Sequence, residues 1–303
     1  MESAAAPSWT MLIVVLPLLA CAISCLCSMV GVSGAFLLLP LQVFLFGASP
    51  SVSATNQLFN LMATPSGIVR YVREGRMLWP LALLLAAGTL PGLFLGVWMR
   101  IAWLPSPVAF SVFVACVLLL IAWNMVRSRR AAAARSATTG RSADTARHSL
   151  IVQCSSFSWR TLSYTFNGAQ YACSVPALLG LSFLVGIVGG AYGIGGGALL
   201  APFLVAHFRL PVHSLSAATL FSTFVTAVAA LITYSLLAAH YPSLSVAPDL
   251  PIGISLGLGG MAGMYAGARL QKRFSGTALH RLLTVLICVT SLVLLGRVAA
   301  TIF

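Results

Sequence analysis

Acidic residues are scarce in this chain. Four carboxylates, Glu2, Glu74, Asp144 and Asp249, occur among 303 residues, against 17 lysines and arginines. None of the four lies inside a long apolar segment, so no carboxylate is placed to relay protons or to bind a cation within a membrane. A transporter of cations is therefore disfavoured.

Other signals are missing as well. The alternating pattern of a membrane β-barrel does not occur. No basic residue precedes the first apolar run, so we expect residues 9–30 to be a retained membrane segment rather than a cleaved signal peptide. The densest group of thiols, Cys21, Cys25 and Cys27, has no partner histidine and no Cys-x-x-Cys spacing. We therefore expect neither a metal site nor a cofactor.

Apolar residues, in contrast, make up 59% of the chain and charged residues 7%, which is more apolar surface than a soluble core could bury. The sequence predicts an all-α integral membrane protein with about 8–10 membrane helices, including short broken or re-entrant ones. The windows of spanning length are 9–30, 52–71, 77–99, 107–126, 213–239, 250–270 and 278–302. Shorter apolar segments occupy 36–46, 176–190 and 198–207.

The basic residues cluster in certain loops. All cations except Arg100 and Arg297 lie in loops that the positive-inside rule places in the cytoplasm, whereas residues 239–250 contain no cation and are placed outside. The net charge of +13 is thus explained by membrane topology rather than by nucleic-acid binding. We expect a multi-pass protein of the plasma or inner membrane, with both termini outside.

One ten-residue stretch occurs twice, as GVSGAFLLLP at 31–40 and as GIGGGALLAP at 193–202. Because glycine weakens a helix and the closing prolines, Pro40 and Pro202, donate no backbone hydrogen bond, each stretch is predicted to interrupt a membrane helix. Unwound backbone is tolerated in a membrane where protein or a water-filled cavity satisfies it. Two matching interruptions therefore indicate a binding site near the midplane.

The similarity between the two halves continues after these stretches, and Tyr71 corresponds to Tyr234. The charge pattern places Tyr71 near the cytoplasmic face and Tyr234 near the outer face. We therefore predict two inverted-topology repeats, 1–126 and 176–303, joined by a basic cytoplasmic linker at 127–175. In both repeats a small-xxx-small spacing, at Gly92 and Gly96 and at Gly263 and Gly267, predicts a close helix crossing.

Residues 176–190 and 198–207 are predicted to form a re-entrant hairpin from the cytoplasmic side, with its tip at 189–197. A matching hairpin with its tip at 31–34 would enter from outside, and two short full crossings are the alternative. In the linker, residues up to about Ser149 are expected to be disordered. Segments 161–166 and 169–174 flank Asn167-Gly168, which predicts a β-hairpin.

Free amides at the start of a broken helix carry partial positive charge and favour a small oxyanion. The first group of predicted substrate-binding residues therefore comes from the interruptions: Gly31, Ser33, Gly34, Gly193, Gly195, Gly196 and Gly197. The second group consists of polar side chains on the helices that follow: Asn56, Gln57, Asn60, Thr219, Ser222, Thr223 and Thr226. The alternatives are that the glycines serve tight helix crossing and that the polar residues form interhelical hydrogen bonds.

The two interrupted segments, the Ser/Ala/Thr runs after them and the Phe-Asn-Gly turn at 166–168 resemble the TauE/SafE family of sulfite and organosulfonate exporters. The first copy departs from the family pattern, since Ser33 and Ala35 stand where glycines are expected. The resemblance implies a permease that moves small sulfur-containing or carboxylate anions, often outward. The expected partners are thus a small anion and the lipid bilayer, with no nucleic acid, and a homo-oligomer is compatible with the sequence.

Two other classes of protein remain alternatives. Gly31-Val32-Ser33-Gly34 also reads as the G-x-S-G motif of rhomboid-type intramembrane serine proteases. Such an enzyme needs a histidine beside the serine, but the five histidines lie in the linker or near predicted helix ends, so we expect no enzyme. A membrane scaffold that transports nothing is the second alternative.

Overall fold

The computed structural model describes residues 9–123 and 152–296, except 107, 118, 121, 122, 209, 243, 276, 280, 283, 286, 287, 290, 291 and 293–295. The predicted disorder of the linker up to Ser149 lies outside these residues. So do parts of the predicted spans at 107–126 and 278–302.

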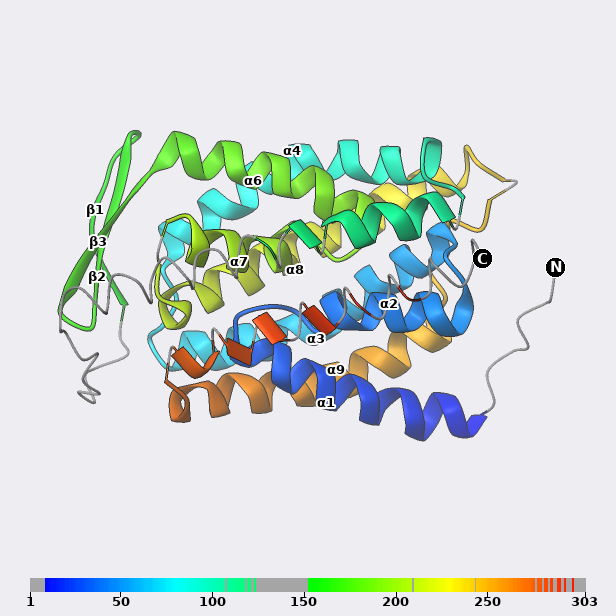
Figure 1. Ribbon diagram of the computed structural model, residues 1–303, viewed down its shortest axis with the longest axis horizontal. Helices are drawn as coiled ribbons and strands as arrows, with labels where there is room; N and C mark the ends of the chain where they lie inside the picture. The colour runs from blue at the N-terminus through cyan, green and yellow to red at the C-terminus, as the bar shows by residue number, and fades with distance from the viewer. Residues whose placement is uncertain are drawn as a thin grey trace.

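The described chain is a bundle of long helices with a small sheet at one end (Figure 1). We call this end the sheet end and the opposite one the far end. A short π-helical turn, Met11–Val15, leads into the first helix, and a 3-10 turn, Gln271–Arg273, follows the last long one. The helices are α1 (Leu16–Met29), α2 (Ala35–Phe46), α3 (Pro50–Arg73), α4 (Trp79–Ala102), Val108–Val117, α6 (Val175–Tyr192), α7 (Gly196–Ala206), α8 (Val212–Ala238) and α9 (Leu250–Leu270).

Five helical segments of the described chain are long and apolar enough to cross a membrane: Met11–Met29, Trp79–Ala102, Val175–Tyr192, Val212–Ala238 and Leu250–Arg273. Helix α3 has 24 residues, but it is the polar element of the bundle and is buried along one face. Large apolar side chains such as Leu83, Ile232 and Leu236 cover the outside. The prediction of a helical integral membrane protein is confirmed, and Trp79 and Trp103 mark the two ends of α4 as interfacial residues do.

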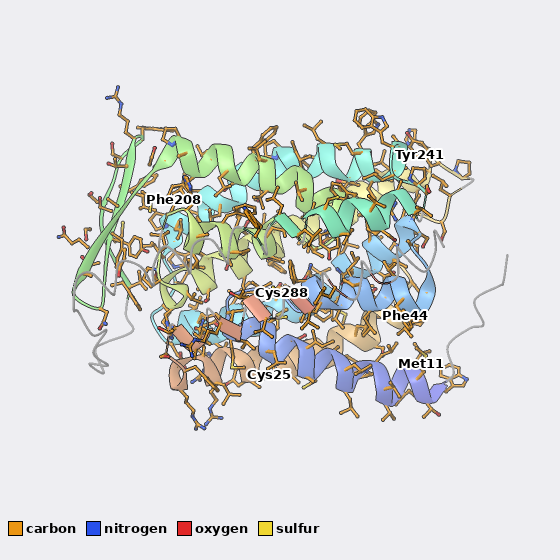
Figure 2. The ribbon with its side chains drawn as sticks, viewed as in Figure 1. Met11, Cys25, Phe44, Phe208, Tyr241 and Cys288 are labelled. Carbon is orange, nitrogen blue, oxygen red and sulfur yellow. The ribbon has the colours of Figure 1, made fainter. Side chains whose placement is uncertain are left out.

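Helices α6 and α7 form a hairpin that begins and ends at the sheet end. Strand β3 (Ala169–Ser174) leads directly into α6, and after α7 the helix α8 starts beside the sheet, where the Tyr164 hydroxyl lies 3.0 Å from Ser214 Oγ. Phe208, just after α7, lies at the sheet end and Tyr241, after α8, at the far end (Figure 2). Helix α6 has 18 residues and extends the predicted segment 176–190 by Val175 at its start and by Ala191 and Tyr192 at its end. Gly189 and Gly190, expected at the tip of the hairpin, therefore lie inside the helix.

Helices α1 and α2 form the corresponding hairpin from the far end. The start of α1 lies beside the start of α9, where Ser255 donates to the carbonyl of Leu12. After α2 the chain enters α3 at the same end, where the amide of Ser51 donates to Ser245 O at 2.9 Å. The two hairpins therefore enter the bundle from opposite ends (Figure 1).

Glycines allow two pairs of helices to approach closely. A Cβ atom at Gly92 or Gly96 of α4 would collide with the backbone of α6, at Phe183 and Ile187. A Cβ atom at Gly263 of α9 would likewise collide with the carbonyl of Cys21 in α1. The close crossings predicted from the small-xxx-small spacing are confirmed, and both of them join one half of the chain to the other.

The sheet has three antiparallel strands in the order β1-β2-β3, where β1 is Val152–Phe157 and β2 is Thr161–Phe166. The predicted hairpin of β2 and β3 is confirmed, and its turn residues Asn167 and Gly168 have positive φ angles of 52° and 75°. Strand β1 was not expected. It pairs with β2 through an irregular register between Cys154 and Ser156, which a simple alternating pattern does not reveal.

Candidate functional site

The turn between α6 and α7 is built around glycines in the left-handed region. Gly193 has φ +87° and Gly195 has φ +77°. A Cβ atom at Gly193 would lie 2.5 Å from the Cβ of Ser53, so α3 presses directly against this turn. Only glycine combines this backbone conformation with so close a neighbour.

The turn between α1 and α2 has the same construction with the halves exchanged. Gly31 has φ +76°, and a Cβ atom there would lie 2.5 Å from Ser216 Oγ of α8. Ser216 corresponds to Ser53 in the alignment of the two halves. Each turn thus rests on the polar face of a long helix of the other half.

Several predicted side chains bind the carbonyls of these turns. Asn56 Nδ2 donates to Gly193 O at 3.0 Å, and Asn60 Nδ2 donates to Ile194 O at 3.0 Å. In the other half, Thr219 Oγ1 donates to Gly31 O at 2.7 Å. These contacts satisfy unwound backbone deep in the protein.

The backbone amides at the amino end of α2 find their hydrogen-bond acceptors in the turn that precedes the helix. Ser33 Oγ donates to Asn60 Oδ1 and accepts from the amide of Ala35 at 3.3 Å. The amides of Phe36 and Leu37 donate to Ser33 O and Gly34 O at 3.2 Å and 3.1 Å. The first interruption therefore leaves little free amide at this position. Ser33 is fully buried, and neither of its hydrogen-bond partners, Asn60 and the amide of Ala35, is a histidine such as a serine protease would need.

The amino end of α7 is different, because Gly195 stands where the first half has Ser33. No side chain caps this helix, and its first amides have no acceptors within the helix. A Cβ atom at Gly195 would lie 3.1 Å from Thr226 Oγ1, 3.3 Å from Thr223 Cγ2 and 3.6 Å from Gln57 Oε1. Three predicted side chains thus surround this helix start.

Gln57 is the distinctive residue of this group. Its side chain is fully buried, its Oε1 accepts from Asn60 Nδ2 at 3.4 Å, and its Nε2 has no hydrogen-bond partner. A buried amide donor without a partner is costly and uncommon in folded proteins. The hydroxyls of Thr223 and Thr226 donate to Thr219 O and Ser222 O, which leaves their oxygens as neutral, polar neighbours.

Two of the predicted glycines serve close packing. A Cβ atom at Gly197 would collide with Thr219 O, so α7 and α8 cross at this residue. A Cβ atom at Gly34 would collide with Ser24 Oγ of α1. Pro40 and Pro202 both lie inside helices, α2 and α7, and are buried there, so the interruptions end before the prolines.

Two residues of this region were not predicted. Gln42 Nε2 donates to Asn56 Oδ1 at 2.8 Å, and Thr89 of α4 lies 3.2 Å from Ser222 Oγ and against Gly196. Gln42 is the one polar residue of the apolar helix α2, and Thr89 is one of two in α4, the other being Arg100. Their rarity in apolar helices is the sequence signal that could have found them. Among the described residues no cluster of His, Cys, Asp or Glu could hold a metal ion.

The structure combines long apolar helices with two hairpins whose tips are buried against the polar faces of α3 and α8. Together with the neutral layer of amides and hydroxyls, these features define a multi-pass membrane protein of the transporter class. The family model described as "Sulfite exporter TauE/SafE" matches residues 16–294, so the chain belongs to this family. It is also similar to the "Probable membrane transporter protein YunE" of Bacillus subtilis (strain 168), with 24% identity over 212 residues, which is 66% of this chain and 69% of the relative. No solved structure matches the chain significantly.

The resemblance predicted from the two interrupted segments is therefore confirmed. Both the family and the relative are transporters, so the chain is a membrane transporter and not the intramembrane protease considered above. A transporter of this kind has a small molecule as its substrate and lipid as its surroundings.

Proposed function

We propose that this protein is a permease that moves a small anion, such as sulfite, an organosulfonate or a related sulfur or carboxylate anion, across the plasma membrane. The observation that carries the proposal is the uncapped amino end of α7 beside the buried Gln57, whose Nε2 has no hydrogen-bond partner. Both groups offer N–H donors in a buried place, and neither acid of the described residues, Glu74 or Asp249, lies there. Such donors favour a negatively charged oxygen.

The neutrality of this site suits transport. The amino end of a helix carries the equivalent of about half a positive charge, which attracts an anion less strongly than a full charge would. The substrate can therefore bind and leave again. The glycines at the turn let the substrate approach the backbone amides closely.

The proposed mechanism is alternating access between two inverted repeats, 1–126 and 176–303, around this site. The reciprocal contacts of Gly193 with Ser53 and of Gly31 with Ser216 support a pseudo-symmetric relation, as does the entry of the hairpins from opposite ends. The charge pattern supports a cytoplasmic sheet end with both termini outside. The family description as sulfite exporters supports outward movement.

The test is sulfite flux in liposomes that contain the purified full-length protein. Vesicles loaded with sulfite should release it in a saturable way, and vesicles without protein should release it much more slowly. Taurine, sulfoacetate and thiosulfate, each loaded in turn, would rank the substrates. Absence of protein-dependent flux for all of these anions would contradict the proposal.

A further inference from the structure

Arg100 is a fully buried cation at the far end of α4. Its Nε donates to Ser53 Oγ at 3.3 Å, one terminal nitrogen donates to Ala48 O at 2.7 Å, and the other donates to Leu104 O. The guanidinium carbon lies 3.7 Å from the ring centroid of Phe110. Three of the five N–H donors of this group are thus used, and every partner is neutral.

The two acids of the described chain lie elsewhere. Glu74 forms ion pairs at the sheet end with Arg70, Arg76 and Lys272. Asp249 caps α9 by accepting from the amide of Ile252 at 3.0 Å. Arg100 therefore has no carboxylate partner among the described residues, although a buried charge is normally paired.

The other half of the chain shows what the fold requires at this position. The alignment that places Gly96 on Gly267 also places Arg100 on Gln271. Gln271 Nε2 donates to Ser216 Oγ at 2.7 Å, as Arg100 Nε donates to Ser53 Oγ. A neutral glutamine thus suffices for the contact with the serine, so this contact does not require the positive charge of Arg100.

Arg100 is also directly connected to the turn between α6 and α7. Ser53, which accepts from Arg100, is the residue against which Gly193 packs. Tyr234 of α8 interacts electrostatically with Arg100, and its fully buried hydroxyl lies near Ser53 without a hydrogen bond of regular geometry in the described part of the chain. A buried phenol beside Ser53 and a cation without a carboxylate partner therefore lie together between the turn and the far end.

We propose that Arg100 and Tyr234 form a second anion site, separate from the amino end of α7, in which a small oxyanion serves as the missing counterion. The two remaining guanidinium N–H groups and the Tyr234 hydroxyl would bind its oxygens. Anion binding at this site does not depend on the proposed function. Only the further statement, that the bound anion is the transported substrate on its way between the far end and the turn, rests on it.

The test measures sulfite binding to the detergent-purified protein by isothermal titration calorimetry, and by thermal stabilisation against sodium chloride of equal ionic strength. Arg100→Gln, which copies the residue of the other half, should raise the dissociation constant about tenfold or more, the loss expected for a charge-assisted hydrogen bond. Arg100→Lys should fall between this variant and the wild type. Tyr234→Phe should weaken binding severalfold. The matched control is Arg269→Gln, which removes an exposed arginine at the sheet end and should leave binding unchanged.

Wild-type affinity in Arg100→Gln would overturn the second site, as would wild-type protein that binds none of sulfite, sulfate and taurine. If Arg100→Gln does not purify as a folded protein, Tyr234→Phe and Arg100→Lys decide the matter in the same way. Flux through liposomes separates the two proposals. Arg100-dependent binding without flux would support the site and contradict the permease, whereas flux with unchanged binding in Arg100→Gln would contradict only the site.

Discussion

Ser53 and Ser216 are small residues with a large structural role, because each supports an interior turn of the opposite half. The sequence predicted the glycines of both turns, since glycine before a buried proline is unusual in an apolar helix. It could not predict which residue each glycine contacts. Asn56 and Gly193 are separated by 137 positions, and such a pairing has no local sequence signal.

Arg100 was also seen in the sequence, but as one of two cations on the outer side of the membrane. Its burial and its lack of a carboxylate partner are properties of the folded protein. A single arginine near the end of an apolar helix more commonly extends toward lipid headgroups. The sequence pattern alone therefore favoured a different role for this residue.

Substitution of Gln57 tests the proposed site at the residue scale. Gln57→Glu places an acceptor and a negative charge beside the amino end of α7, and we expect sulfite flux in liposomes to fall at least tenfold, equivalent to about 1.4 kcal/mol. Gln57→Met, which removes the donor without adding charge, should reduce flux less. Size-exclusion profiles and melting temperatures of both variants would show that folding is retained. Equal flux in Gln57→Glu and wild type would argue against substrate binding at this position.

At the scale of whole helices, close packing depends on glycine at defined places. The small-xxx-small spacing predicted two close crossings, but it did not predict that α4 packs on α6 and α9 on α1. The boundaries of the long helices were predicted within a few residues, because apolar runs and flanking polar loops define them. Strand β1 was missed, since its residues lack clear alternation.

Gly92→Ala should destabilise the α4–α6 crossing. The added methyl group would collide with Phe183 O, so the helices must separate, and overpacking of this kind costs about 1–3 kcal/mol. Gly180→Ala is the matched control, because Gly180 lies in α6 with nothing within 4 Å of the added atom. Thermal unfolding in detergent should show a lower melting temperature for Gly92→Ala and an equal or higher one for Gly180→Ala. A melting temperature for Gly92→Ala at or above the wild-type value would contradict the packing described for this crossing.

Tyr164 of the sheet contacts Ser214 at the start of α8, and Tyr164→Phe should lower stability by about 1 kcal/mol by removing this contact. Burial raises the pKa of the Tyr164 phenol above its ordinary value, so the folded state favours the neutral form. The contribution of the neutral Tyr164 phenol to the free energy of unfolding is complete below about pH 10, and it is lost as the pH rises further. Thermal unfolding at neutral and at alkaline pH should therefore show a smaller difference between Tyr164→Phe and wild type at alkaline pH. A difference that grows with pH would contradict this role.

For the molecule as a whole, the closest helix contacts join one half of the chain to the other, since α4 packs on α6 and α9 packs on α1. The sequence predicted two halves of related origin, and the structure shows that each half supplies the surface on which the other half's turn rests. Contacts between the halves are therefore as much part of the site as the glycines themselves. The packing of each turn on the other half was not predictable, because similarity between two sequence segments carries no information on how the two copies contact each other.

The distribution of acids leads to a prediction at this scale. Among the described residues, Glu74 forms ion pairs at the sheet end and Asp249 caps α9, so neither is free to bind a sodium ion in the interior. Sulfite flux should therefore be the same in sodium and in N-methylglucamine buffers of equal osmolarity. Parallel flux measurements in the two buffers provide the test, and a strict requirement for sodium would count against an uncoupled anion carrier.

The pairing of α1 with α9 has a consequence for biosynthesis. Ser28 donates to Met264 O across 236 positions of the chain, so α1 meets this partner only after the helices between them have been synthesised. Until then the glycine-fitting face of α1 must be covered by lipid or by the insertion machinery. The pairing of α1 with α9 is therefore a late step of assembly, and long-range contacts of this kind make that step slow.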